Sequence, residues 1–217
     1  MKLVLLLVAI LAFSFALDVP KRPDGYSYGT PEDPTATLDV FVDILCSACK
    51  AFEPQFVDFL ANYTIHDRPV TDFLDIKFHI FPLPYHHNAF FISRLAPFIQ
   101  DTKPDQLSVV EFIHWGLSVQ DRYLSSGSLD KAEPEVLKNM CTDFTEEIAK
   151  GIHSFEDCMA AMHNRNYELD ARASWKYAAY MGVNGTPTLL LNGVPVDPPF
   201  DAEEWPKFLE KYLPSES

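Results

Sequence analysis

The sequence predicts an α/β domain in which strands near the two ends of the chain enclose a long helical segment. Residues 37–45 and 75–82 are short runs rich in β-branched and aromatic residues, which is typical of buried strands. Residues 88–181 instead carry apolar side chains at helical spacing. Residues 188–196 hold two short apolar runs around Asn192-Gly193, a dipeptide that favours a two-residue hairpin turn because both positions adopt positive φ.

Composition agrees with one folded domain. Hydrophobic residues make up 47% of the 217 residues, enough for a sizeable core. The formal net charge of −14 disfavours nucleic acids and anionic membranes as partners.

Residues 1–16 predict a cleaved secretory signal. Lys2 precedes an apolar run, and Ser14 and Ala16 place small residues at the cleavage positions. A membrane anchor is the alternative, but the apolar run has roughly 15 residues and a span needs about 20. We therefore expect a secreted protein or one in the lumen of the endomembrane system. Residues 17–217 should form a single domain with no membrane span after cleavage.

A pair of cysteines follows the first core strand. Residues 26–28 are a candidate edge strand, and residues 37–45 then lead directly into Cys46-Ser47-Ala48-Cys49. Residues 50–60 have helical spacing, so the pair lies at the start of a helix. The free N–H groups and positive dipole at a helix start favour a thiolate. We expect Cys46 to be an exposed attacking thiol and Cys49 a resolving thiol one turn later.

The remaining cysteines weigh against a metal site. Cys141 and Cys158 do not form a second zinc knuckle, so we expect no metal and no other cofactor. They lie on consecutive predicted helices at similar heights, which favours a structural disulfide in an oxidising compartment. An inert Cys46–Cys49 bridge stays open as an alternative. The protein would then be a redox-inactive binding or chaperone module.

The middle of the chain reads as one strand followed by helices. His79 should point outward from the strand at residues 75–82, and His86-His87 should begin a helical run at residues 88–102. Further helix starts are predicted at Pro104-Asp105, Pro134, Ser154 and Tyr167, with a loop at residues 125–128. Asn62-Tyr63-Thr64 is a glycosylation sequon, so Asn62 is a candidate glycan site.

A second motif stands near the C-terminus. Gly182 lies where a helix end requires positive φ, and Gly185-Thr186-Pro187 leads into the strand that begins at residue 188. After the hairpin, Asp201 is expected to cap a last helix. The inner face of that helix is expected to comprise Trp205, Phe208, Leu209 and Tyr212.

Three segments together resemble the DsbA-like branch of the thioredoxin superfamily. They are residues 42–49, 81–84 and 182–193, and the resemblance covers about residues 25–213. It implies a thioredoxin fold, which is a mixed central sheet flanked by helices. The helical insertion at about residues 88–181 would separate its βαβ and ββα halves.

The resemblance also implies a function and a site. Pro187 would be a cis-proline beside the dithiol, and the backbone around Gly185 and Thr186 would bind an extended substrate segment. Cys46 and Cys49 would exchange disulfides with protein or peptide thiols. Glutathione or another redox partner would recycle the pair, and we expect a monomer. A kappa-type glutathione transferase is a further alternative, but that family usually carries a serine in place of this pair.

Two positions depart from the family pattern. The residues between the cysteines are Ser47-Ala48, so no histidine there stabilises a thiolate. Val40 replaces a buried acid that several relatives carry six residues before the first cysteine. Asp43 is a candidate for that acid's role as a proton relay. A capping or solvated carboxylate is the alternative for Asp43.

Overall fold

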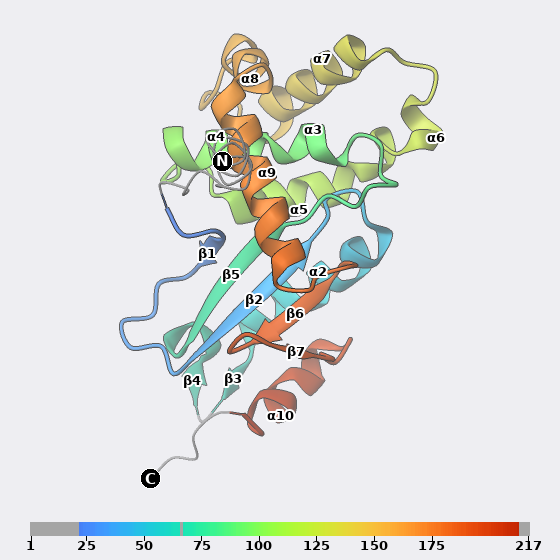
Figure 1. The fold of residues 1–217 in the computed structure, drawn as a ribbon. Coiled ribbons are helices and arrows are strands. Elements are labelled where there is room, and N and C mark those ends of the chain that lie inside the picture. The colour runs from blue at the N-terminus through green and yellow to red at the C-terminus, as the bar shows by residue number, and fades with distance from the viewer. Residues whose placement is uncertain (1–21, 66, 213–217) are drawn as a thin grey trace, which may run out of the picture.

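The computed structural model describes residues 22–65 and 67–212, so the predicted signal at residues 1–16 lies outside the described residues. A five-stranded sheet in the order β1-β5-β2-β6-β7 forms the lower half of Figure 1. Its strands are β1 (Tyr26–Tyr28), β2 (Ala36–Val42), β5 (Leu74–Ile80), β6 (Thr188–Leu191) and β7 (Val194–Val196). A separate small hairpin comprises β3 (Thr64–Ile65) and β4 (Arg68–Pro69).

The sheet is mixed, as predicted. β2 and β5 pair in parallel, and the other three contacts in the sheet are antiparallel. A parallel pair needs a crossover connection, which α2 (Ser47–Asn62) begins. The predicted edge strand at residues 26–28 is confirmed as β1. The predicted hairpin is also confirmed, with φ of 51° at Asn192 and 78° at Gly193.

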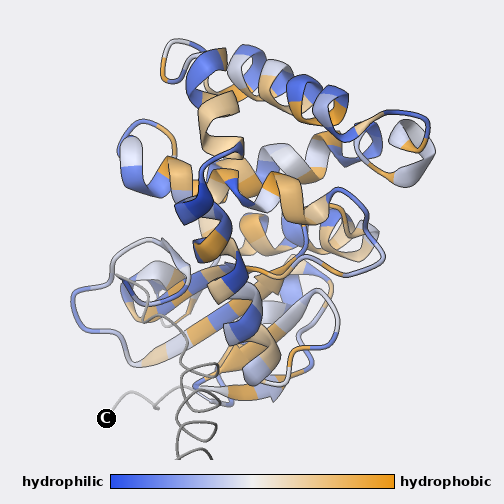
Figure 2. Ribbon diagram, turned by 45° about the horizontal axis from the view of Figure 1, so that its top comes forward, coloured by the Kyte–Doolittle hydropathy of each residue, from blue (hydrophilic) through white to orange (hydrophobic). Residues whose placement is uncertain are grey.

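Helices cover both faces of the sheet. On one face, Phe56 of α2 packs against Phe78 of β5 and against Trp205 of α10 (Trp205–Leu209). On the other face, Tyr177 of α9 (Arg165–Tyr180) stacks with Phe41 of β2. This double covering explains why β2 is apolar almost throughout. Figure 2 shows the strands mainly in orange, whereas the helices above them carry alternating blue and orange stripes.

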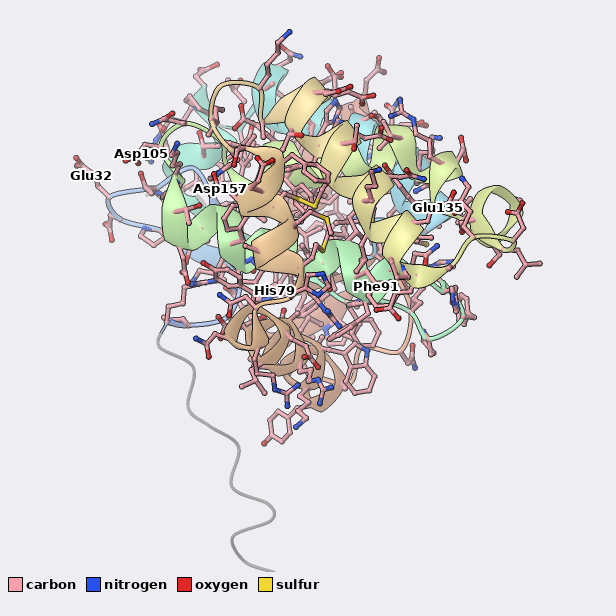
Figure 3. All side chains as sticks on the ribbon, turned by 90° about the horizontal axis from the view of Figure 1, so that it is seen from above. Glu32, His79, Phe91, Asp105, Glu135 and Asp157 are labelled. Carbon is pink, nitrogen blue, oxygen red and sulfur yellow. A yellow bond between two sulfur atoms is a disulfide. The ribbon has the colours of Figure 1, made fainter. Side chains whose placement is uncertain are left out.

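The helical insertion stacks above the sheet in Figure 1. It comprises α3 (Ala89–Ser93), α4 (Leu95–Thr102), α5 (Val109–Val119), the 3₁₀ turn η2 (Gln120–Arg122), α6 (Ser125–Ser128), α7 (Glu133–Asp143), the π-helical turn η3 (Phe144–Ile148), α8 (Phe155–Met162) and α9. A disulfide between Cys141 on α7 and Cys158 on α8 links two of these helices, with their Cα atoms 5.6 Å apart. It is the yellow bond in Figure 3. None of the helices in the described residues has the length and apolarity that crossing a bilayer requires.

Several predicted boundaries in the insertion were wrong. The run at residues 88–102 is broken between α3 and α4, and residues 125–128 form the short helix α6 rather than a loop. α5 begins after Ser108 rather than at Pro104-Asp105, because Ser108 and Glu111 form a reciprocal capping box. The predicted start at Ser154 is confirmed by a second capping box, with Asp157.

Two corrections concern the sheet. The first core strand ends at Val42 and not at residue 45, because Asp43 O accepts a hydrogen bond from Cys46 N and closes a turn. His79 is 1% exposed rather than outward, since Asp24 and Asp39 bind its ring.

The last helix also differs from the prediction. Residues 202–204 form a 3₁₀ turn before α10, and the Asp201 side chain forms no capping hydrogen bond. Trp205 and Leu209 are fully buried, but Tyr212 lies beyond α10 and is 51% exposed.

Candidate functional site

The two motifs found in the sequence meet at one edge of the sheet. Cys46 is the N-cap residue of α2, just after β2, and Thr186-Pro187 immediately precedes β6. β2 and β6 are antiparallel neighbours, with Phe41 opposite Thr188, so the end of β2 lies beside the start of β6. The Thr186–Pro187 peptide bond is cis. Cys46 Sγ lies 3.3 Å from Thr186 O.

The surroundings of Cys46 favour its thiolate. The pKa of Cys46 is lowered to about 5, chiefly because the Cys49 thiol donates a hydrogen bond to its sulfur. Burial opposes this effect, whereas the Thr186 side chain and the N–H groups of Cys49 and Ala48 add to it. A thiol with this pKa is largely ionised at pH 7, whereas an ordinary cysteine is mostly protonated.

Cys49 has the opposite character. It is 0% exposed, and burial together with the hydrogen bond and negative charge of Cys46 raises the pKa of its thiol. One sulfur therefore carries the charge while the other holds a proton, although both stand on the same helical turn. Both thiols are free in this structure.

Cys46 is less accessible than expected. Its exposed fraction is 7%, so the prediction of an exposed attacking thiol was wrong. The physical reason is the proline loop, whose residue Thr186 contacts the sulfur from the far end of the sequence.

Asp43 joins the turn before Cys46 to the loop after β5. Its carboxylate is 1% exposed and accepts hydrogen bonds from Leu45 N at 2.8 Å and Leu83 N at 2.9 Å. His86 Nδ1 lies 2.6 Å from Asp43 Oδ2. Burial raises the pKa of Asp43, and His86 and the two backbone donors oppose that shift. None of these partners is a cysteine, so a relay role for Asp43 stays a prediction.

The sequence did not predict that two buried polar residues, Gln120 and Glu53, would lie near the dithiol. Gln120, in η2, donates from Nε2 to Ile44 O at 2.9 Å and Cys46 O at 3.3 Å. Nothing local marks it, because its partners lie more than 70 residues earlier. Glu53 stands one helical turn after Cys49, is 3% exposed, and is bound by His114 Nδ1 at 2.9 Å. A charged residue on the apolar face of a predicted helix was the available signal for Glu53.

The other predicted site residues lie apart from the dithiol or beside the loop. Asn62 is exposed at the end of α2, and its Nδ2 donates to Asp58 Oδ1. Gly185 O accepts a hydrogen bond from Thr188 Oγ1, which closes the proline loop. Within residues 22–65 and 67–212, no group of three or more His, Cys, Asp or Glu side chains is arranged to hold a metal ion.

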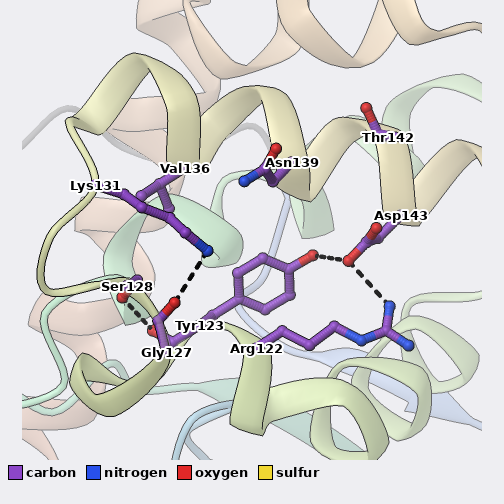
Figure 4. Close-up of a pocket in the computed structure, with 9 residues that line it drawn as sticks. All are labelled: Arg122, Tyr123, Gly127, Ser128, Lys131, Val136, Asn139, Thr142 and Asp143. Carbon is purple, nitrogen blue, oxygen red and sulfur yellow. Dashed lines mark hydrogen bonds and ion pairs between the residues drawn. The ribbon is translucent and has the colours of Figure 1, made fainter.

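A cavity of about 380 Å³ lies beyond η2, between α6 and α7 (Figure 4). Its polar groups are largely satisfied by one another. Tyr123 Oη and Arg122 both donate to Asp143, and Lys131 Nζ donates to Gly127 O. We interpret these hydrogen bonds as structural contacts that hold η2 against α7, and not as a ligand site.

Comparisons with known proteins agree with this geometry. A family model described as thioredoxin matches residues 21–211. Among solved structures, α-DsbA1 from Wolbachia pipientis is similar with a TM-score of 0.63 and 14% identity, covering 90% of this chain and 93% of that chain. DsbA from Chlamydia trachomatis is similar with a TM-score of 0.62 and 17% identity, covering 90% of this chain and 94% of that chain. BdbD from Bacillus subtilis is similar with a TM-score of 0.58 and 16% identity, covering 87% of this chain and 98% of that chain.

A search of curated proteins gave no match. The structural similarities confirm the predicted thioredoxin fold with a helical insertion and the resemblance to DsbA-like proteins.

Proposed function

This chain belongs to the thioredoxin family, and we propose that it exchanges disulfides with protein substrates in the secretory pathway, with Cys46 as nucleophile and Cys49 as resolving thiol. One observation carries the proposal. Cys46 lies at the start of α2 with its Sγ 3.3 Å from Thr186 O of the cis-proline loop, whereas Cys49 is fully buried one turn later. These surroundings lower the pKa of Cys46 to about 5 and raise that of Cys49. A purely structural pair has no need of such a difference between its thiols, whereas attack and resolution require it.

The exchange proceeds in two balanced steps. In the oxidising direction a client thiolate attacks Cys46 Sγ of the Cys46–Cys49 disulfide. The client–Cys46 bond forms, the Cys46–Cys49 bond breaks, and Cys49 leaves as a thiolate that takes up a proton. A second client thiolate then attacks the client sulfur of the mixed disulfide and releases the Cys46 thiolate. Two electrons pass from the client dithiol to the protein pair.

The low pKa of Cys46 favours this direction. A stabilised thiolate lowers the free energy of the reduced protein, so the disulfide form becomes a stronger oxidant. The predicted signal at residues 1–16 supports an oxidising compartment, in which client disulfides persist. The reverse reaction uses the same atoms, with the Cys46 thiolate attacking a client disulfide.

The proline loop supports the protein-substrate class. Thr186 O lies 3.3 Å from Cys46 Sγ, so a client segment that pairs with the backbone of Thr186 would run across the reactive sulfur. Strand addition of this kind binds an extended segment without selecting its sequence. A Cβ built on Gly185 meets no atom of the described residues within 4 Å, so there is open space beside this part of the loop.

Redox titration in glutathione buffers tests the proposal. We expect a reversible transition of the Cys46–Cys49 pair between about −120 and −270 mV, the interval of known catalysts. Cys49→Ala should accumulate a mixed disulfide with a dithiol peptide that has first been oxidised, and Cys46→Ala should not. A bond that stays intact below about −300 mV would contradict the proposal and favour a binding module with a structural bridge.

A further inference from the structure

A second cavity is lined in part by Leu83 and His86, the two residues after β5 that bind the Asp43 carboxylate. It has a volume of about 390 Å³, within the range of ligand sites. We call it the basic cavity, and its lining residues are Pro82, Leu83, Pro84, His86, His87, Phe90, Arg172, Trp175 and Lys176. They come from the loop after β5, from the start of α3 and from α9.

The charge of the basic cavity is opposite to that of the protein. Arg172, Lys176 and two histidines line it, and none of the described residues that line it is Asp or Glu. The chain as a whole carries a formal charge of −14, so a cavity without a carboxylate is a local exception. Arg172 is paired with Glu168 at 2.5 Å, whereas Lys176 forms no ion pair within the described part of the chain.

The apolar wall of the basic cavity is fixed in place. Trp175 is 38% exposed, yet its Nε1 donates to Pro82 O at 3.1 Å and its ring stacks on Phe81. An exposed tryptophan held in this way offers a rigid contact surface at a low cost in side-chain entropy. Tyr85, which is 69% exposed, adds a second aromatic surface beside His86.

The basic cavity and the dithiol share Asp43. The Asp43 carboxylate binds Leu83 N and His86 Nδ1 at the wall of the cavity. The Asp43 carbonyl accepts from Cys46 N, so Asp43 and Cys46 are the ends of one tight turn, less than about 7 Å apart. An extended peptide spans about 3.3 Å per residue. A client residue three or four positions from the reacting cysteine lies about 10–13 Å from it, and we take this spacing for a residue that would enter the cavity.

We propose that the basic cavity binds an acidic residue of the client segment while a nearby client cysteine reacts at Cys46. This inference rests on the proposed function and adds a substrate preference to it. The carboxylate of the client would pair with Lys176 and Arg172, and the apolar part of its side chain would pack on Trp175. Client segments with Asp or Glu at that distance from the cysteine would be preferred over neutral or basic ones.

Three dithiol peptides that differ at one position test the preference. The position lies three or four residues from a cysteine and carries Glu, Gln or Lys, and kcat/KM for peptide oxidation is measured with the intact protein. We expect the Glu peptide to be the best substrate. Lys176→Glu should lower kcat/KM for the Glu peptide by about fivefold, the size of one exposed ion pair, and change that of the Gln peptide by less than about twofold.

Lys207→Glu is the matched control, because Lys207 is an exposed lysine on α10, which packs on the opposite face of the sheet from α9. It changes the net charge equally and should leave the preference intact. Arg172→Gln provides a second variant should Lys176→Glu not fold.

The outcomes separate this inference from the proposed function. An equal kcat/KM for the three peptides in the wild-type protein, or an unchanged Glu-to-Gln ratio in Lys176→Glu, would overturn the docking site and leave the oxidoreductase intact. Failure of the wild-type protein to oxidise any of the three peptides would overturn the proposed function. Equal inhibition of Glu and Gln peptides by phosphate at constant ionic strength would indicate a general anion site and would also overturn the docking proposal.

Discussion

Replacing His79 by leucine should destabilise the protein strongly without altering its dithiol chemistry. The His79 ring is 1% exposed, with Nδ1 2.6 Å from Asp24 Oδ2 and Nε2 2.8 Å from Asp39 Oδ1. Because each ring nitrogen faces a carboxylate oxygen, only the imidazolium can donate to both. Burial opposes that charge, but the hydrogen bonds to Asp24 and Asp39 outweigh it and raise the pKa of His79. Asp24 also accepts from Ser174, so this cluster ties the N-terminal segment to β2, β5 and α9.

The size of the effect follows from the two carboxylates that His79→Leu leaves behind. Their side chains are only 17% and 12% exposed, so both would lose their counter-charge in a poorly solvated place. Removing one partner of a buried pair costs about 3–5 kcal/mol. For a domain of this size about 1 kcal/mol corresponds to about 2–4 °C, so Tm should fall by about 6–20 °C. The assay is thermal unfolding followed by circular dichroism at pH 6.

The stability contributed by His79 should also depend on pH. The folded-state pKa lies above the unfolded value of about 6.5. The stabilisation is therefore fully present below about pH 6.5 and is lost as the pH rises through the folded pKa. The matched control is His79→Leu/Asp24→Asn/Asp39→Asn, which should recover part of the lost Tm and lack this pH dependence. A Tm of His79→Leu within about 2 °C of wild type would refute the reasoning.

Two further predictions concern the cysteines. Cys49→Ala should raise the pKa of Cys46, because the hydrogen bond from the Cys49 thiol is the largest cause of the low pKa of Cys46. The ultraviolet absorbance of the Cys46 thiolate, recorded against pH, measures this shift. Cys141→Ala/Cys158→Ala should lower the free energy of unfolding by about 3 kcal/mol, because the disulfide closes a loop of 17 residues; urea denaturation measures the change.

Each of these two predictions has an outcome that would contradict it. An unchanged Cys46 titration in Cys49→Ala would show that the helix start and Thr186 alone set the pKa. The double variant should keep the redox transition of Cys46–Cys49, since the second disulfide lies in the insertion; a shifted transition would show that the two pairs are coupled.

The features that depend on neighbouring residues could be predicted from the sequence. Asn192-Gly193 forms its hairpin turn, and Gly182 has φ of 82°, because backbone conformation there is set by the residue itself and its neighbours. The mixed sheet and the place of the helical insertion were expected from the resemblance of segments 42–49, 81–84 and 182–193 to the DsbA-like branch, whereas hydrophobic spacing indicated only the type of each element. Boundaries were less accurate where caps and turns decide them, as at Ser108 and Asp43.

The protonation and accessibility of the site came from contacts between distant parts of the chain. Thr186 lies 140 residues from Cys46, and Gln120 lies 74 residues from it, yet both bind that residue. His79 fits the alternating pattern of a strand, so the sequence indicates on which face of the sheet it lies. Whether that face is exposed to water or packed against carboxylates depends on where Asp24 and α9 lie in the folded protein. A linear pattern specifies which residues share an element and a face. Burial and charge at that face depend on what folding brings opposite to it, and those two quantities set the pKa of Cys46 and the state of His79.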